Sequence, residues 1–201
     1  MPMRFIVLFL FFGLVGCVHH PKYPATWSPL QTSITSDCSD LSGTYENRAV
    51  GDTESEPLAY MLERQVDLST SRFRNPDFRR IDSVRFRVSA PYATADFLAG
   101  DEVISTLDLG APKRSAECDG HVLKLRKLMS GTAPLALDAG HYRTFLYRAK
   151  DESIVMRSGA SEVGVVLVVP VAYSEFRWFR FARKGVNGSP STKEAAGNAS
   201  R

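Results

Sequence analysis

The chain contains three cysteines, Cys17, Cys38 and Cys118, and these are the residues whose type and position most directly suggest chemistry. A thiol can be acylated, can close a disulfide or can bind a metal ion. In an exported protein, an odd number of cysteines requires a separate role for one of them. Cys17 differs from the other two because it directly follows a long apolar segment, so its chemistry depends on what that segment does.

Residues 1–16 have the pattern of a cleavable export signal. Arg4 supplies the positive start, and an apolar run of about eleven residues extends from Phe5 to Val15. This run is too short to cross a bilayer, because a membrane-spanning helix takes about 20 apolar residues. Polar and turn-forming residues follow from His19 onward. The sequence therefore predicts a signal segment rather than an integral membrane anchor.

The last residues of this segment, Leu14-Val15-Gly16-Cys17, resemble the lipobox of bacterial lipoproteins. The resemblance implies diacylglyceryl transfer to the Cys17 sulfur, cleavage before Cys17 and acylation of the new amine. Several acyl chains would hold the protein on a membrane permanently, because each buried methylene contributes about 0.8 kcal/mol. Val18 follows the cysteine where an aspartate would favour the inner membrane, so the resemblance favours the outer membrane facing the periplasm. The alternative is an ordinary secretory signal with a chance cysteine.

If Cys17 is acylated, Cys38 and Cys118 remain as a natural pair. Disulfides form and persist in oxidising compartments such as the periplasm. In the chain-entropy model, closing a loop of about 80 residues stabilises the fold by about 4–5 kcal/mol. We therefore expect a Cys38–Cys118 disulfide, with two free thiols as the alternative.

The mature chain divides into three parts by composition. Residues 17–36 are rich in proline, serine and threonine, which is typical of an extended tether next to the lipid site. Residues 185–201 are small and polar with no apolar period, and we expect them to be disordered. The folded domain is therefore expected over residues 37–184.

Near its start the domain carries the motif Asp40-Leu41-Ser42-Gly43-Thr44-Tyr45-Glu46-Asn47. This motif resembles the opening of a group of uncharacterised proteobacterial lipoproteins, and the resemblance returns at the aromatic end near Trp178. Membership would imply a β-rich periplasmic domain. It brings no catalytic residue to this chain.

The periodicity of the domain predicts one short helix and many strands. Leu58, Met61, Leu62 and Val66 have helical spacing, with Thr53 or Ser55 as the N-cap and Pro57 in the first turn. Strands are expected over residues 83–88, 102–109, 121–128, 141–148, 153–157, 164–171 and 175–182, with 165–169 in a central, doubly buried strand. Turns are expected at 119–120, 139–140 and 158–159. The prediction is a mainly β domain, an antiparallel barrel or sandwich of about seven or eight strands with one helix near its start.

No short motif identifies a catalytic centre, a phosphate loop or a zinc site. Cys118, Asp119 and His121 could supply metal ligands, but the disulfide is the preferred interpretation of Cys118. We therefore expect no metal site, no cofactor and no identifiable catalytic residue. An enzyme, for example a hydrolase built from residues distant in the sequence, ranks last among the function classes.

Two clusters remain as candidate ligand or partner surfaces. The first is basic and includes Arg72, Arg74, Arg79 and Arg80, whose guanidinium groups suit phosphate or another anion. The second is the segment from Phe176 to Phe181. In a strand, Phe176 and Trp178 would lie on one face, and Phe179 and Phe181 on the other. For each cluster the preferred interpretation is structural: a solvated strand face for the arginines, and a final core strand, buried on both faces or bulged, for the aromatic residues.

The charge balance excludes one broad class of partner. The net charge is +3, with 44% hydrophobic and 23% charged residues, which is ordinary for a globular protein and unlike the concentrated basic face of a nucleic-acid binder. The preferred function is an envelope interaction or structural module that is held on a membrane and contacts another envelope protein. The alternative is a lipocalin-like carrier of a small apolar ligand, which needs a cavity lined by apolar side chains.

Overall fold

The computed structural model describes most of the chain between Val18 and Gly185. The described residues are 18–19, 21–32, 35–51, 56–66, 79–89, 91–110, 115–120, 122–133, 136–166 and 169–185. Its elements are β1 (Val18–His19), η1 (Ser39–Leu41), β2 (Gly43–Glu46), α2 (Leu58–Val66), β3 (Ser83–Ser89), β4 (Tyr92–Ala99), β5 (Glu102–Asp108), β6 (Ser115–Cys118), β7 (Leu123–Ala133), β8 (Ala136–Arg148), β9 (Ile154–Val166) and β10 (Val169–Phe181).

The strands form two sheets, so the prediction of a mainly β fold with one helix is confirmed. One sheet has the order β1-β10-β9-β8-β7-β6, and the other has the order β2-β3-β4-β5. Neighbouring strands are antiparallel except for β1, which runs parallel to β10. Neither sheet closes on itself within the described chain, so the barrel alternative is wrong and an open, sandwich-like packing of two sheets fits better.

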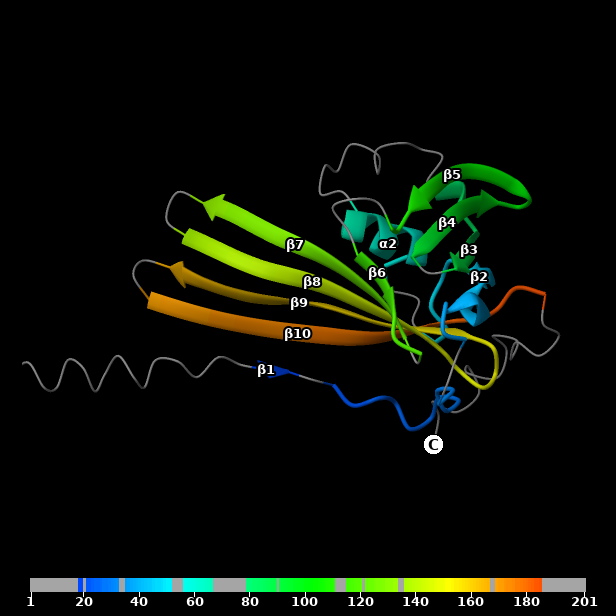
Figure 1. Ribbon diagram of the computed structural model, residues 1–201, viewed down its shortest axis with the longest axis horizontal. Coiled ribbons are helices and arrows are strands. Elements are labelled where there is room, and N and C mark those ends of the chain that lie inside the picture. Colours follow the sequence, from blue (N-terminus) through cyan, green and yellow to red (C-terminus); the bar gives the residue numbers. More distant parts are fainter. Residues whose placement is uncertain are drawn as a thin grey trace, which may run out of the picture.

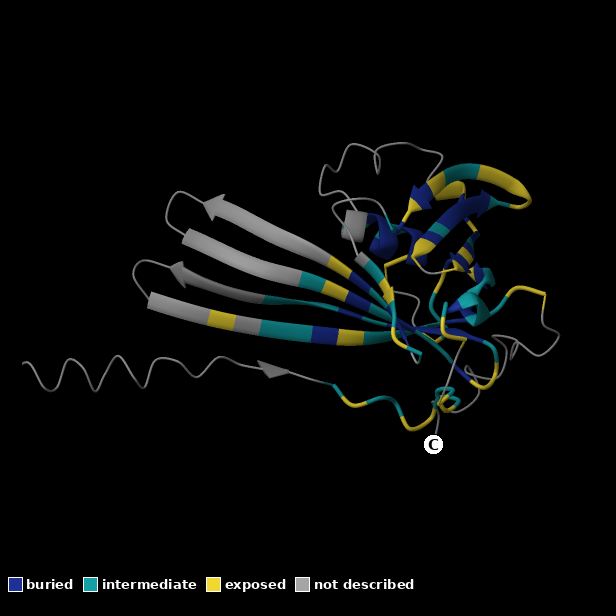
Figure 2. Cartoon of the chain, viewed as in Figure 1, coloured by how far each residue is buried: buried dark blue, intermediate teal, exposed yellow. Residues whose placement is uncertain are grey.

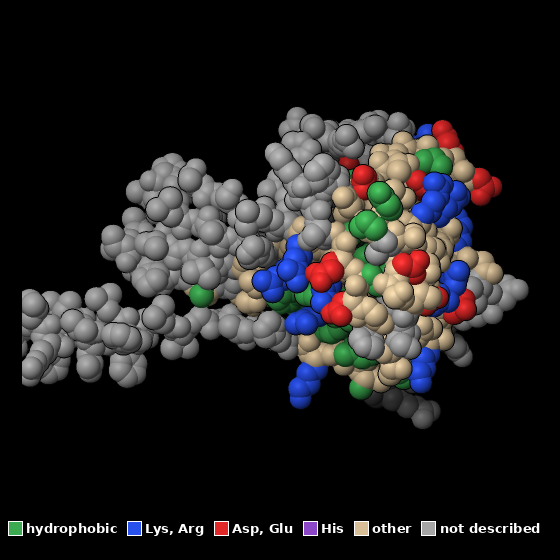
Figure 3. All heavy atoms as spheres, in the orientation of Figure 1, with side chains coloured by type: hydrophobic (Ala, Val, Ile, Leu, Met, Phe, Trp, Pro, Cys, Tyr) green, Lys and Arg blue, Asp and Glu red, His purple; other side chains and the backbone are tan. Residues whose placement is uncertain are grey.

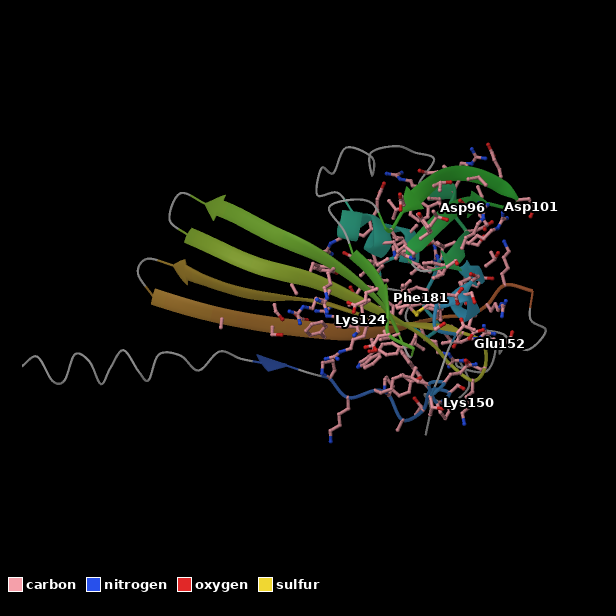
Figure 4. All side chains as sticks on the ribbon, viewed as in Figure 1. Asp96, Asp101, Lys124, Lys150, Glu152 and Phe181 are labelled. Atoms are coloured by element: carbon pink, nitrogen blue, oxygen red, sulfur yellow. A yellow bond between two sulfur atoms is a disulfide. The ribbon has the colours of Figure 1, made fainter. Side chains whose placement is uncertain are left out.

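The hydrophobic core lies where the two sheets meet around α2. Figure 1 shows the four-stranded sheet and α2 at one end of the long strands β7–β10, and Figure 2 shows buried residues at this end. The core joins Phe86 and Phe97 of the four-stranded sheet, Leu62 of α2, and Leu146 and Phe181 of the six-stranded sheet. Figure 4 shows Phe181 where β10 reaches this end. We call this compact part the globular end.

Several predicted strands and one predicted turn are confirmed in position. In β3, Val84, Phe86 and Val88 are buried while Arg87 is exposed, as the alternation predicts. The strand expected over 102–109 is β5, and the turn expected at Asp119-Gly120 separates β6 from β7.

The start of α2 is held by a residue distant in the sequence. Asn47 accepts hydrogen bonds from the Leu58 amide through its main-chain oxygen and from the Ala59 amide through its side-chain Oδ1, both at 2.8 Å. The Asn47 Nδ2 in turn donates to the Ile81 carbonyl at 2.9 Å. Thr53 and Ser55, the predicted caps, lie outside the described residues. Asn47 therefore ties the helix to the strand that begins just after Ile81.

The second half of the chain departs from the prediction because its strands are longer. The residue pairs 139–140 and 158–159 are not turns, since they lie inside β8 and β9. Residues 164–171 are not one central strand, because β9 ends at Val166 and β10 starts at Val169, which pair with each other. A Cβ at position 159 would lie 1.9 Å from the Glu175 carbonyl oxygen, so Gly159 serves a close approach of backbones rather than a turn.

The Cys38–Cys118 disulfide is confirmed. It joins the residue that precedes η1 to the last residue of β6, with the two Cα atoms 5.7 Å apart. Because η1 lies against β3 and β6 is an edge strand of the other sheet, the disulfide connects the two layers.

The segment expected to be an extended tether lies against the domain where the structure describes it. Val18 and His19 pair with Ser174 and Glu175 of β10. Further along, the Gln31 amide donates to the Arg148 carbonyl at 2.8 Å, and the Lys150 amide donates to the Pro29 carbonyl at 2.9 Å. Residues 18–19 and 21–32 therefore follow the six-stranded sheet from the middle of β10 to the β8–β9 turn (Figure 1).

Candidate binding surface

The register of β8, β9 and β10 places aromatic residues and an arginine in one row. Phe145 pairs with Arg157, and Arg157 pairs with Trp178. Paired residues lie on the same face of a sheet, and alternate residues lie on opposite faces. Because Leu146 and Phe181 belong to the core, this row occupies the outer face of the sheet, away from α2 and the four-stranded sheet.

The Arg157 guanidinium lies among three aromatic rings. Its Cζ atom is 4.6 Å from the ring centre of Phe176, 5.6 Å from that of Trp178 and 5.9 Å from that of Phe145. A cation at this distance is attracted to the ring face by about 0.5–2 kcal/mol, depending on desolvation. The rings also contact each other, with centroids 5.7 Å apart for Tyr147 and Trp178. We call Phe145, Tyr147, Arg157, Phe176 and Trp178 the aromatic–arginine surface.

The N-terminal segment adds two more aromatic rings to this surface. Tyr23 meets Trp178 edge to face at 5.2 Å between ring centres, and Trp27 meets Tyr23 at 5.9 Å. The Trp178 Nε1 donates a hydrogen bond to the Pro21 carbonyl at 2.9 Å. The side chains of Tyr23, Trp27 and Trp178 stay half-buried, so the covered surface still presents aromatic rings to its surroundings.

The two tyrosines of this region stay neutral at ordinary pH. Burial raises the pKa of Tyr147, and the nearby Arg157 opposes that shift only in part. Burial likewise raises the pKa of Tyr23, and Arg180 lowers it by a smaller amount. Because both pKa values lie above the ordinary phenol value of 10.0, neither hydroxyl carries a negative charge near neutral pH.

Basic side chains border the aromatic–arginine surface. Lys124 pairs with Asp119, Arg126 lies 3.7 Å from Glu117, and Arg180 lies 2.5 Å from Asp151. Figure 3 shows Lys and Arg side chains, with acidic ones beside them, where the long strands leave the globular end, and Figure 4 places Lys124 there on β7. The Arg126–Glu117 pair is exposed, so it contributes about 0–1 kcal/mol and leaves Arg126 available to an anionic partner. The side chains of Lys124 and Arg180 are largely covered.

This combination suits an interface between water and an apolar phase. Tryptophan and tyrosine combine an apolar ring with a polar end, and they concentrate at the headgroup level of membranes. Arginine forks bind phosphate, and their stems pack on apolar groups. Across the described ranges, no group of three or more His, Cys, Asp or Glu side chains is placed to hold a metal ion.

The structure separates the two clusters that the sequence proposed. Phe176, which is buried, and Trp178, which is half-buried, belong to the aromatic–arginine surface, whereas the half-buried Phe179 and the buried Phe181 face the core. Arg79 and Arg80 are exposed beside the other sheet, where Arg80 lies 3.5 Å from Glu102 of β5. Cys17, Arg72, Arg74 and His121 lie outside the described residues.

Sequence reasoning missed Phe145, Tyr147, Arg157 and Tyr23. The pairing register of the strands could have identified these residues. Phe145 pairs with Arg157 across the β8–β9 turn, and Arg157 pairs with Trp178 across the β9–β10 turn. The prediction placed a turn at Gly159 and a separate strand over 164–171, so it did not contain the pairing of β9 with β8 and β10.

No helix within the described ranges is both long and apolar enough to cross a membrane. No protein-family model, curated protein or solved structure matches the chain.

Proposed function

We propose that the protein is a bacterial envelope lipoprotein, acylated on Cys17, whose folded domain docks on the membrane through the aromatic–arginine surface. One observation carries this proposal: the chain that follows Cys17 runs along that surface. Val18 pairs with Ser174, and the Trp178 indole donates to the Pro21 carbonyl, only four residues after Cys17 in the sequence. An anchor on Cys17 would therefore hold the aromatic–arginine surface beside the bilayer rather than far above it.

The composition of the surface supports the same partner. Its rings and guanidinium group match the two zones of a membrane interface, the acyl boundary and the phosphate level. Val18 after the cysteine favours the outer membrane, with the domain on its periplasmic side. The carrier alternative has less support because the sheets stay open and core side chains fill the space between them.

Flotation with phospholipid vesicles tests the docking surface without the anchor. The Cys17→Ala chain, purified without acyl groups, is expected to float with vesicles that contain phosphatidylglycerol. Trp178→Ala in that background is expected to lower binding several-fold because a ring of the surface is removed. Tyr92→Ala is the matched control, since Tyr92 is an aromatic residue of the other sheet that is 78% exposed. Equal loss in both variants, or loss in neither, would contradict the docking proposal.

Labelling with palmitate tests the anchor separately. Wild-type protein is expected to incorporate the label, and the Cys17→Ala variant is expected to incorporate none. Persistent labelling of the variant would show that Cys17 is not the attachment site.

A further inference from the structure

Two arginines face each other on the outer face of the six-stranded sheet. Arg126 of β7 pairs directly with Arg143 of β8, and both side chains are exposed. Like charges at paired positions destabilise a sheet, because the Cβ atoms of paired residues lie only about 4.5–5.5 Å apart. We call Arg126 and Arg143 the arginine pair. Its arrangement suits the binding of an anion better than the stability of the fold.

Acidic side chains neutralise the arginine pair only in part. Arg126 lies 3.7 Å from Glu117, and both side chains of this ion pair are about half exposed to solvent. Among the residues that the structure describes, no carboxylate forms an ion pair with Arg143. The Arg143 guanidinium is therefore open to an anion from outside the described chain.

The strand register joins the arginine pair to the aromatic rings. Arg143 pairs with Gly159, and Gly159 pairs with Phe176, so the three residues form one row. Phe145 lies two residues after Arg143 on the same face of β8, and the centres of the Phe145 and Phe176 rings are 6.3 Å apart. The N-terminal segment contacts Trp178 at the other side of this surface, on β10. The arginine pair is thus the β7–β8 border of the aromatic–arginine surface.

The charge of this border matches an anion with two negative charges. The rows of Phe176 and Trp178 contain four cations, and two carboxylates pair with them; the cations are Lys124, Arg126, Arg143 and Arg157, and the carboxylates are Glu117 and Asp119. These rows therefore carry an excess of two positive charges. A phosphate monoester carries a charge of about −1.5 to −2 at pH 7, whereas a diester carries a single negative charge. A monoester would balance the excess, and a diester would leave part of it uncompensated.

The chemistry of the guanidinium group favours the same ligand. Each guanidinium presents a planar fork of N–H donors that binds two phosphate oxygens at once. A monoester offers three unesterified oxygens to two opposed forks, and a diester offers two. The rings of Phe145 and Phe176 beside the arginine pair would contact the apolar part of the ligand. Resting on the proposed membrane docking, we infer that the arginine pair binds the phosphate monoester headgroup of a membrane lipid.

Two lipids that differ by one methyl group test this inference. The Cys17→Ala chain, purified without acyl groups, is mixed with phosphatidylcholine vesicles of matched zeta potential. These vesicles contain either phosphatidate, which is a monoester, or phosphatidylmethanol, which is its methyl diester. We expect at least fivefold tighter binding to the phosphatidate vesicles. Equal binding to both kinds of vesicle would overturn the inference.

Substitutions locate the preference on the sheet. In the same background, Arg143→Gln and Arg126→Gln are each expected to reduce the preference below twofold, and Arg143→Lys should retain part of it. Arg79→Gln is the matched control, because it removes one exposed positive charge beside the other sheet, and it should keep the fivefold preference. An unchanged preference in Arg143→Gln, or an equal loss in Arg79→Gln, would overturn the inference.

Thermal unfolding separates binding from a structural role. The melting temperature of Arg143→Gln is expected to be unchanged or higher, because the substitution removes one of two opposed like charges. A clear fall in melting temperature together with lost binding would mean that Arg143 supports the fold instead, and would overturn the inference.

A soluble monoester separates a lipid headgroup from free phosphate. Glycerol 3-phosphate has the same phosphate group without acyl chains, so at an equal concentration of phosphate groups it should displace little protein from the vesicles. Complete displacement would overturn the assignment to a lipid. If the lipid preference is absent while Trp178→Ala still weakens vesicle flotation, membrane docking stands and only the headgroup inference fails. If Trp178→Ala also has no effect, both proposals fail.

Discussion

Arg157 shows how one residue can organise a surface. Its guanidinium contacts the rings of Phe145, Phe176 and Trp178, which come from two strands on either side of its own. Arginine is suited to this position because its planar group stacks on rings and is less strongly hydrated than an ammonium. The rings keep the side chain half-buried on the sheet.

Replacing Arg157 should weaken both the fold and the surface. For Arg157→Leu we expect the free energy of unfolding to fall by about 1–2 kcal/mol, because the contacts with the rings are lost. Urea denaturation measures this change. Arg157→Lys keeps the charge without the planar fork and should fall between wild type and Arg157→Leu. Wild-type stability in both variants would mean that the ring contacts contribute nothing.

A second prediction concerns the side chain of Asn47. Asn47→Ala removes the acceptor for the Ala59 amide and the donor to the Ile81 carbonyl, and Asn47 is buried, with 5% of its surface exposed. We expect a loss of about 1–3 kcal/mol in the free energy of unfolding, because one buried partner is left unsatisfied at each end. Asn47→Asp keeps the acceptor and loses the donor, so it separates the two contributions. A change below about 0.5 kcal/mol would contradict the role of Asn47 as a cap.

At the scale of elements, the packing of β9 against β10 depends on Gly159. A methyl group there would lie 2.7 Å from the Phe176 Cα as well as 1.9 Å from the Glu175 oxygen, and backbone atoms cannot move aside cheaply. Gly159→Ala should therefore destabilise the domain by about 1–3 kcal/mol. Thermal unfolding of this variant and of Ala160→Gly, the neighbouring control, measures the effect. A smaller loss for Gly159→Ala than for the control would show that the two strands can separate freely.

The same elements show what sequence patterns could predict. β3 has a clear alternation, and α2 has apolar residues at helical spacing, so local period was sufficient for them. β5 was predicted in position, but only Leu107 of its expected inner face is buried, and Val103 is exposed. β2, β4 and β6 were not predicted. β4 buries both faces over Ala95–Leu98, and β2 and β6 have only four residues each, so neither shows a usable period.

The aromatic–arginine surface was predicted only in part for a related reason. Phe176 and Trp178 were identified because they lie together in the sequence. Phe145 and Arg157 join them only through pairing between strands, which a pattern within one strand does not contain. Gly159 misled the prediction of a turn, because a glycine suits a close approach of two backbones as well as a turn.

At the scale of the whole molecule, the disulfide holds the two layers together. It links Cys38, beside η1, to Cys118 at the end of an edge strand, across 80 residues of sequence. We expect reduction, or a Cys38→Ala/Cys118→Ala double variant, to lower the free energy of unfolding by about 2–5 kcal/mol. Denaturation with and without reductant measures this difference. Identical curves would show that packing alone holds the layers.

The position of the N-terminal segment gives the molecule its orientation. An anchor on Cys17, followed by a strand paired with β10, would turn the outer face of the six-stranded sheet towards the bilayer and leave the four-stranded sheet facing away. The domain would then work at the membrane surface, and the short stretch between anchor and sheet would leave it little freedom to swing away.

Tryptophan fluorescence tests this orientation most directly, because the chain contains two tryptophans, Trp27 and Trp178, and both lie at the aromatic–arginine surface. The acylated protein would be reconstituted in vesicles with and without brominated lipids, and a Trp27→Phe variant would isolate the signal of Trp178. We predict that brominated lipids quench Trp178 strongly, with a blue-shifted emission that marks a ring at the acyl boundary. Emission that is unchanged by brominated lipids in the membrane-bound protein would contradict the account.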